Sequence, residues 1–118
     1  MTKHEFGIMD EIMYNVRYDF YDPEEYNCIS VNDDFIEEML HNYFEDFKKM
    51  KVYAHTTSYP VWGLNYDGIT LIPPESLQQF SDIVIRANRH YKSQQLGLLI
   101  DMLYEAMENN KFLIHFGI

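Results

Sequence analysis

Apolar residues recur at steps of three and four along residues 33–50, which predicts one amphipathic helix there. The apolar positions are Ile36, Met39, Leu40, Tyr43, Phe44, Phe47 and Met50. Asn32 or Asp33 can cap the start of this helix by accepting hydrogen bonds from its first backbone N–H groups. Lysines gather at its end, where the helix dipole favours positive charge.

A second helical pattern begins at the prolines of "PPESLQQF" and runs to Tyr91, because proline suits the first turn of a helix. The apolar stripe of this helix consists of Leu77, Phe80, Ile83, Val84, Ala87 and Tyr91. A break near Lys92 and Ser93 separates it from a third helix, whose apolar positions run from Leu96 to Met107 and which is expected to stop at "ENN", residues 108–110. Apolar residues again line one face of that third helix, so both helices are expected to pack on a core.

Strands are predicted over residues 26–31, 51–57, 64–72 and 111–118, where β-branched and aromatic residues concentrate. Asp67-Gly68 is an alternative: it could form a tight turn that splits the third of these strands. Residues 1–25 show no sustained period, so we interpret them as an extended, loop-rich arm.

The element order is therefore β-α-β-β-α-α-β, which indicates an α+β fold in one domain, residues 1–118, with an arm before a core over residues 26–118. We expect a mixed or antiparallel sheet with helices on one face, and a ferredoxin-like topology is one candidate. The last strand is apolar at successive positions, as in a strand covered on both faces. The arm, a partner or a second copy would have to cover the second face.

The composition is that of an ordinary globular protein, with 118 residues of which 47% are hydrophobic. A single cysteine, Cys28, excludes an internal disulfide. Neither a signal peptide nor an apolar run of membrane-spanning length is visible, so we expect a cytoplasmic protein.

The distribution of charge says more about possible partners than the composition does. The net charge is −10, and residues 1–50 carry 13 acidic and 4 basic side chains against 6 and 5 in residues 51–118. Such a surface repels the phosphates of nucleic acids and anionic lipids, so we expect neither nucleic acid nor a membrane as a partner. A basic protein would instead be attracted. The alternative is that the acidity serves only solubility.

Residues 18–27, "YDFYDPEEYN", place the rings of Tyr18, Phe20, Tyr21 and Tyr26 among four carboxylates. Tyrosines beside carboxylates suit the recognition of Arg and Lys on a partner protein. The predicted protein-binding residues are Tyr18, Asp19, Tyr21, Asp22, Glu24 and Glu25. The alternative is that the rings anchor the arm to the domain while the acids remain in solvent.

No phosphate-binding glycine loop, zinc-ligand motif or nucleophile elbow is present, so no catalytic residue, cofactor or metal is predicted. Cys28, His55 and His115 lie in predicted strands and could meet on one sheet face, although three separately packed residues are the simpler interpretation. The alternative small-molecule site comprises His55, Tyr66, Asp67 and His115. The remaining histidines, His4, His41 and His90, are expected at the surface.

These observations favour a small acidic protein-binding domain, such as an immunity or antitoxin protein that inhibits a basic partner. The alternatives are a small enzyme or small-molecule binder with a cleft near the strand ends, and a domain that forms homodimers through an open sheet face.

Overall fold

The computed structural model describes residues 2–14, 16–19 and 21–118, and Phe20 of the tyrosine-rich segment lies outside them. The strands are β1 (Lys3–Met9), β2 (Ile29–Asn32), β3 (Lys51–Ala54), β4 (Pro60–Trp62), β5 (Ile69–Ile72) and β6 (Phe112–Phe116). The helices are α1 (Asp33–Asn42), α2 (Phe44–Phe47), α3 (Pro74–Tyr91) and α4 (Gln94–Glu108), with a short 3-10 helix, η1, at Pro23–Tyr26.

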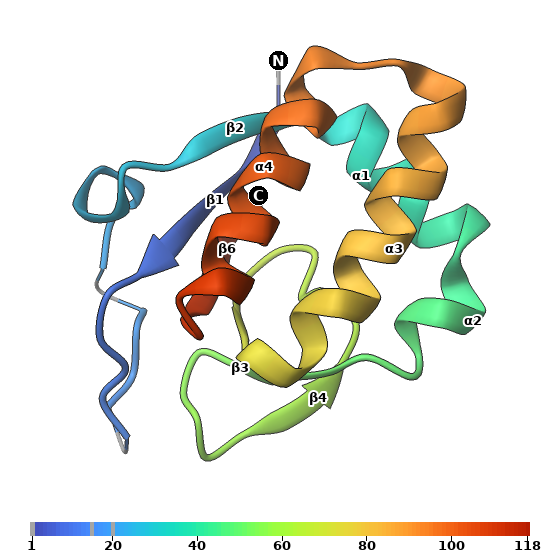
Figure 1. Cartoon of the computed structure of the whole chain (residues 1–118). Helices are drawn as coiled ribbons and strands as arrows, with labels where there is room; N and C mark the ends of the chain where they lie inside the picture. Colours follow the sequence, from blue (N-terminus) through green and yellow to red (C-terminus); the bar gives the residue numbers. More distant parts are fainter. Residues whose placement is uncertain (1, 15, 20) are drawn as a thin grey trace.

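The six strands form one sheet in the order β2-β1-β6-β5-β3-β4, and every neighbouring pair is antiparallel. Helices α3 and α4 lie side by side against this sheet, and α1 and α2 lie beside α3 (Figure 1). The α+β class and the antiparallel sheet are therefore confirmed, in a single compact domain.

The two helices that connect β5 to β6 explain why these neighbouring strands are antiparallel. One helix would return the chain to its starting end and deliver a parallel strand. Here α3 ends at Lys92, which has a left-handed backbone with φ 52°, and α4 starts at once with Ser93 as its cap. The second helix reverses the chain again, so β6 pairs antiparallel with β5. The ferredoxin-like alternative is not confirmed.

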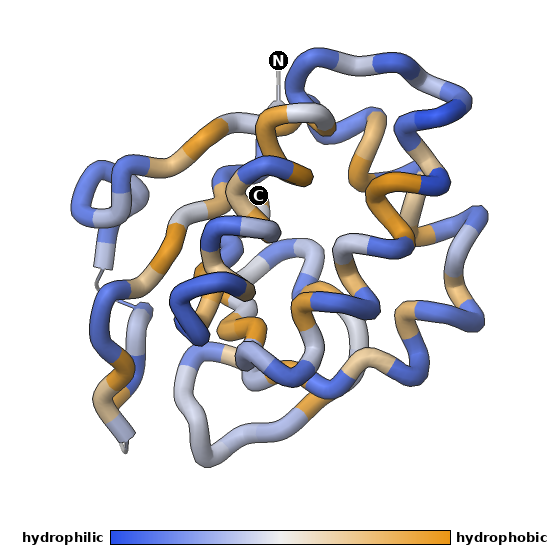
Figure 2. Tube along the Cα trace, viewed as in Figure 1, coloured by the Kyte–Doolittle hydropathy of each residue, from blue (hydrophilic) through white to orange (hydrophobic). Residues whose placement is uncertain are grey.

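All four helices contribute to a core on one face of the sheet. Most apolar positions that the helical patterns predict are buried there, including Ile36, Phe80 and Leu103, whereas Phe44 is exposed. The rings of Phe6 on β1 and Phe80 on α3 lie 5.8 Å apart and join the sheet to this helix layer. Hydrophobic and hydrophilic segments alternate along α3 and α4 in Figure 2, as expected for helices with one buried face.

The arm packs on the opposite face of the sheet, and the structure describes its residues 10–14, 16–19 and 21–28. A second core cluster forms there from Met9, Tyr18, Ile69, Leu71, Ile114 and Phe116. The last strand is thus covered on both faces, as its continuous apolar sequence predicted. The arm therefore packs on the face through which the homodimer alternative was expected to act, and that alternative stays a prediction.

The largest difference from the sequence analysis lies at the start of the chain. Residues 3–9 are not an extended arm but strand β1, which pairs with β2 on one side and β6 on the other. The predicted helix over residues 33–50 is interrupted at Tyr43 into α1 and α2. The Asp67-Gly68 alternative fits better than one long strand, because β5 begins only at Ile69.

No helix in the described ranges has both the length and the apolar character needed to cross a membrane.

Candidate functional site

The rings of the tyrosine-rich segment hold the arm on the sheet. Tyr18 is 1% exposed. Its ring centroid lies 4.8 Å from that of Tyr21, which in turn lies 6.3 Å from Tyr26, and Tyr26 contacts Phe116 of β6 at 6.1 Å. Tyr18 therefore packs inside the protein and, contrary to our prediction, offers no surface to a partner.

The acids of the same segment remain in solvent. Asp22, Glu24 and Glu25 are exposed and form no ion pair within the described part of the chain. Glu25 accepts a hydrogen bond from the backbone N–H of Asp22 at 2.7 Å, which fixes the turn that begins η1. The segment thus presents its carboxylates on a defined backbone.

Four carboxylates line a groove of about 420 Å³, which we call the acidic groove. Its lining consists of Ile8, Asp10, Glu11, Glu24, Glu25, Tyr26 and Asn27. Asp10 is paired with Lys111 at 2.7 Å, whereas no ion pair is formed by the other three acids among the described residues. The acidic groove therefore combines the side chains of Ile8 and Tyr26 with excess negative charge.

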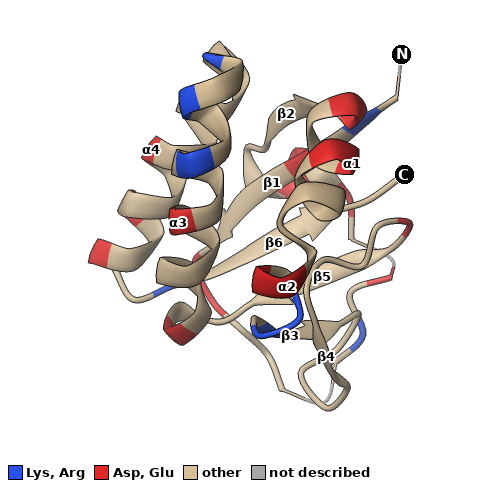
Figure 3. Cartoon of the chain, turned by 90° about the vertical axis from the view of Figure 1, so that its right-hand side faces the viewer, with Lys and Arg blue, Asp and Glu red and all other residues tan. Residues whose placement is uncertain are grey.

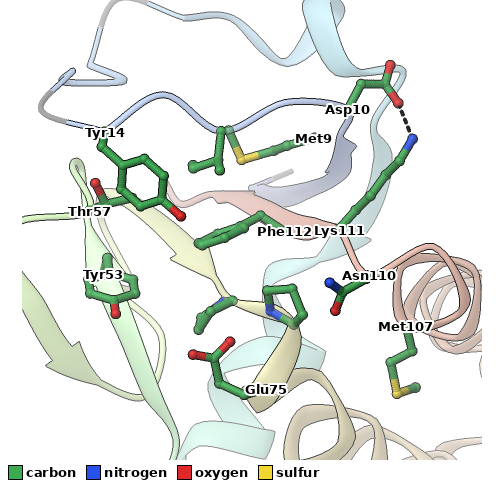
Figure 4. A pocket seen from close by; sticks show the side chains of 13 residues that line it. Met9, Asp10, Tyr14, Tyr53, Thr57, Glu75, Met107, Asn110, Lys111 and Phe112 are labelled. Carbon is green, nitrogen blue, oxygen red and sulfur yellow. Dashed lines mark hydrogen bonds and ion pairs between the residues drawn. The ribbon is translucent and has the colours of Figure 1, made fainter.

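A larger hollow of about 580 Å³, the arm pocket, lies next to the acidic groove and shares Asp10 with it. Figure 4 shows the rings of Tyr14, Tyr53 and Phe112 around this pocket, with the carboxylate of Glu75 directed into it and the Asp10–Lys111 pair at its edge. Glu75 lies in the first turn of α3 and is exposed. The arm pocket thus offers aromatic walls, the carboxylate of Glu75, and at its edge the carboxylate of Asp10, which Lys111 neutralises.

A buried chain of hydrogen bonds crosses three strands on the helix face of the sheet. His4 Nε2 lies 2.8 Å from Asp33 Oδ1, His4 Nδ1 lies 2.8 Å from His115 Nε2, and His115 Nδ1 lies 3.1 Å from Thr70 Oγ1. Tyr66 donates its hydroxyl to the same carboxylate oxygen of Asp33. Both histidines are fully buried.

The partners at the two ends fix the direction of these hydrogen bonds. The backbone N–H of Asn65 donates to Thr70 Oγ1 at 2.8 Å, so the threonine hydroxyl can donate to His115 Nδ1. His115 then donates from Nε2 to His4, and His4 donates from Nε2 to Asp33. Burial, followed by the neighbouring His4, lowers the pKa of His115 to about 3, so this imidazole is neutral near pH 7.

A separate pocket of about 440 Å³, the His55 pocket, opens at the end of β3 and beside β4. It is lined by Arg17, Ala54, His55, Tyr59, Val61, Trp62, Leu64 and Asn65. Asp19 Oδ1 lies 2.5 Å from His55 Nδ1, and Asp19 Oδ2 accepts a 2.7 Å hydrogen bond from Arg17 Nε. This contact places the Asp19 carboxylate directly beside Nδ1, although its geometry departs from that of a hydrogen bond.

The hydrogen bond from Arg17 lowers the pKa of Asp19, and the charge of Arg17 and the neighbouring His55 lower it further. Asp19 is therefore ionised near pH 7 and is engaged with its neighbours. Among the predicted protein-binding acids, it is the one whose charge is largely compensated within the protein.

The predicted small-molecule residues do not form one site. Tyr66 and His115 belong to the buried chain, His55 faces its own pocket, and Asp67 is exposed in the turn before β5. Cys28 lies on the arm face of the sheet, opposite to His115, so these two residues do not meet, in agreement with the simpler interpretation of separately packed residues.

Sequence reasoning missed His4, Asp33 and Thr70 as members of the buried chain. His4 was expected at the surface because of its place near the start of the chain. It is instead directed inward from a strand that the sequence pattern did not indicate. Alternation of His4, Phe6 and Ile8 along β1 was the only available signal.

Carboxylates of Asp33, Asp34 and Glu37 lie within 4.8 Å of one another at the start of α1, close enough to share a cation. One oxygen of Asp33 already accepts hydrogen bonds from His4 and Tyr66, and the other two residues are exposed. Acids at this position are also explained by the helix dipole, so the cluster is an ordinary feature of a helix start.

Comparisons of the chain with protein-family models, with curated proteins and with solved structures give no match.

Proposed function

We propose that the protein binds a basic protein partner through the acidic groove and the adjoining arm pocket, in the manner of an immunity or antitoxin protein that inhibits a basic toxin. The observation that carries the proposal is a preformed concave surface with three exposed carboxylates that have no ion-pair partner among the described residues: Glu11, Glu24 and Glu25. Carboxylates held in this way are available for Arg and Lys of a partner.

The distribution of charge supports this proposal. Figure 3 shows acidic residues on α1 and α2, whereas basic residues gather on the second half of α3. Arg86 of α3 pairs with Asp46, and no such pair joins α3 to the acids of the arm in the described ranges. The field of the arm is therefore directed to solvent, where it can speed the approach of a basic protein.

The arm pocket suits an anchoring side chain of that partner. A lysine or arginine that enters it would place its cation near the Glu75 carboxylate and its aliphatic stem against the rings of Tyr14, Tyr53 and Phe112. Anchors of this kind carry much of the affinity of protein interfaces, while the surrounding acids set orientation and association rate.

The test compares two variants that each remove three negative charges. The groove variant carries Glu11→Gln, Glu24→Gln and Glu25→Gln, and the matched control carries Asp34→Asn, Glu37→Gln and Glu38→Gln on α1. Immobilised wild type, groove variant and control variant are incubated with lysate of the cells that carry the gene, and bound proteins are eluted with increasing salt.

The proposal predicts a basic protein that wild type and control retain at low salt, that salt releases, and that the groove variant loses. With that protein purified, the groove substitutions should slow association by about tenfold at low salt. Equal retention by all three forms, or loss in the α1 variant alone, would refute the acidic groove as the binding surface.

A further inference from the structure

The His55 pocket combines exposed aromatic rings with an oriented imidazole. Trp62 and Tyr59 are 59% and 62% exposed, although large apolar rings in an ordinary surface usually find cover. Val61, Leu64 and Ala54 complete an apolar lining, and the polar groups are Arg17, Asn65 and His55. Apolar and aromatic walls with a few convergent polar groups are typical of small-molecule sites.

The backbone of His55 is held in an unusual conformation. Its φ is 63°, in the left-handed region that side chains other than glycine seldom adopt. The N–H of His55 donates to the carbonyl of Ile69 at 3.1 Å, and the carbonyl of His55 accepts from the N–H of Tyr18 at 2.8 Å. Both β5 and the arm thus fix the conformation that aims the imidazole, and such strain is often found at binding sites.

The neighbours of the imidazole determine which nitrogen is available to a ligand. The carboxylate of Asp19 beside Nδ1 favours the proton on that nitrogen. The amide nitrogen of Asn65, which can only donate, lies 3.3 Å from Nε2. Nε2 is therefore a hydrogen-bond acceptor, and the 3.3 Å contact is long enough for a stronger donor to replace it.

We propose that the His55 pocket binds a neutral hydroxy-aromatic ligand of the phenol class, whose ring packs on Trp62 and whose hydroxyl donates a hydrogen bond to His55 Nε2. Asn65 would then donate its amide N–H to the oxygen of the phenol, so that no polar group loses a partner. A neutral ligand agrees with a protein of net charge −10, which disfavours anions, and with Arg17, which disfavours cations inside this pocket.

The experiment uses phenol and its methyl ether, anisole, as a matched pair that differs in the hydroxyl proton. Trp62 is the single tryptophan of the chain, so the indole N–H signal in NMR and tryptophan fluorescence both report on this pocket alone. Phenol should shift the indole signal and the His55 Nε2 resonance at millimolar concentration, and anisole should bind about tenfold more weakly.

Two variants and one direct measurement keep the proposal falsifiable. His55→Phe keeps a ring but removes the acceptor, so it should reduce the preference for phenol to about twofold or less. His90→Phe, the same substitution at an exposed site on α3, should leave the preference unchanged. If His55→Phe fails to fold, the change in the His55 nitrogen chemical shifts when phenol is added to the wild type tests the proposal instead. Equal binding of phenol and anisole, or no response of Trp62 to either, would overturn the proposal.

Discussion

Because His115 is buried in the chain of hydrogen bonds, the free energy of unfolding depends on pH over the range in which His115 is protonated in the unfolded chain only. In the unfolded chain its imidazole has the ordinary pKa of 6.5, and in the folded protein burial and His4 lower the pKa to about 3. Acidification below pH 6.5 therefore protonates His115 in the unfolded chain but not in the folded protein. The stabilisation is complete above pH 6.5 and is lost as the pH falls from 6.5 towards 3.

The size of the effect follows from these two pKa values. Between pH 7 and pH 5, a single group of this kind lowers the free energy of unfolding by about 2 kcal/mol. The groups at the two ends of the chain of hydrogen bonds, Asp33 and Thr70, do not obscure this window. Hydrogen bonds from Tyr66 and His4 lower the pKa of Asp33 below its ordinary 3.8, so its carboxylate stays ionised down to pH 5. Thr70, which faces the other nitrogen of His115, does not titrate.

Urea unfolding followed by far-UV circular dichroism at pH 7, 6 and 5 measures this dependence. His115→Gln should be less stable than wild type at pH 7 by about 2 kcal/mol, because the buried partners His4 and Thr70 lose a hydrogen bond. Its stability should nevertheless change far less than that of wild type between pH 7 and pH 5. His41→Gln, on the exposed face of α1, is the matched control and should keep the wild-type slope.

Two results would show that this reasoning is wrong. One is a pH dependence of the same size in wild type and His115→Gln. The other is a His115 imidazole that protonates above pH 5 in the folded wild type, seen from its ring nitrogen shifts in NMR. The second measurement needs no variant, so it decides the matter even if His115→Gln does not fold.

Three further predictions concern packing and reactivity. Leu113→Ala, in the centre of the sheet, should lower the free energy of unfolding in urea by about 3 kcal/mol, because the side chain is fully buried; a loss below about 1 kcal/mol would contradict that burial. Gly117→Ala should destabilise the protein strongly, since an added Cβ would lie 2.2 Å from the carbonyl oxygen of Tyr66. Gly97→Ala on α4 should instead raise the urea midpoint slightly, because the added Cβ would have no atom within 4 Å and alanine favours the helix. Burial, together with nearby acids, raises the pKa of the Cys28 thiol to about 12. Iodoacetamide at pH 8 should therefore alkylate Cys28 in the folded protein at least about 100-fold more slowly than in the chain unfolded by urea. Equal rates would contradict this.

The parts of the fold that sequence predicts are those whose signals are local. Helix α3 runs from Pro74 to Tyr91 as expected, because both its proline start and its apolar stripe lie within the helix itself. Strand β1 escaped prediction because both of its faces are partly covered: Phe6 points to the helices and Met9 to the arm, while Lys3 stays exposed. Partial cover on both faces weakens the alternation of apolar and polar residues that identifies a strand.

The candidate sites were less accessible to sequence reasoning than the fold. His4 and His115 are 111 positions apart and meet only because β1 and β6 are neighbours in the sheet. The acids of the arm segment were identified from their local density, and Glu24 and Glu25 do line the acidic groove. Whether a tyrosine beside them points inward, as Tyr18 does, depends on tertiary packing that no local pattern encodes.

The position of β6 has a consequence for how the protein is made. This strand, the last of the sheet to be synthesised, is also the one that joins the pair β2–β1 to the group β5–β3–β4. Until residues 112–116 leave the ribosome, the nascent chain holds two incomplete sheets, each with an unpaired edge open to wrong partners. Residues 112–116 must therefore be synthesised before the two halves of the sheet can pair through β6.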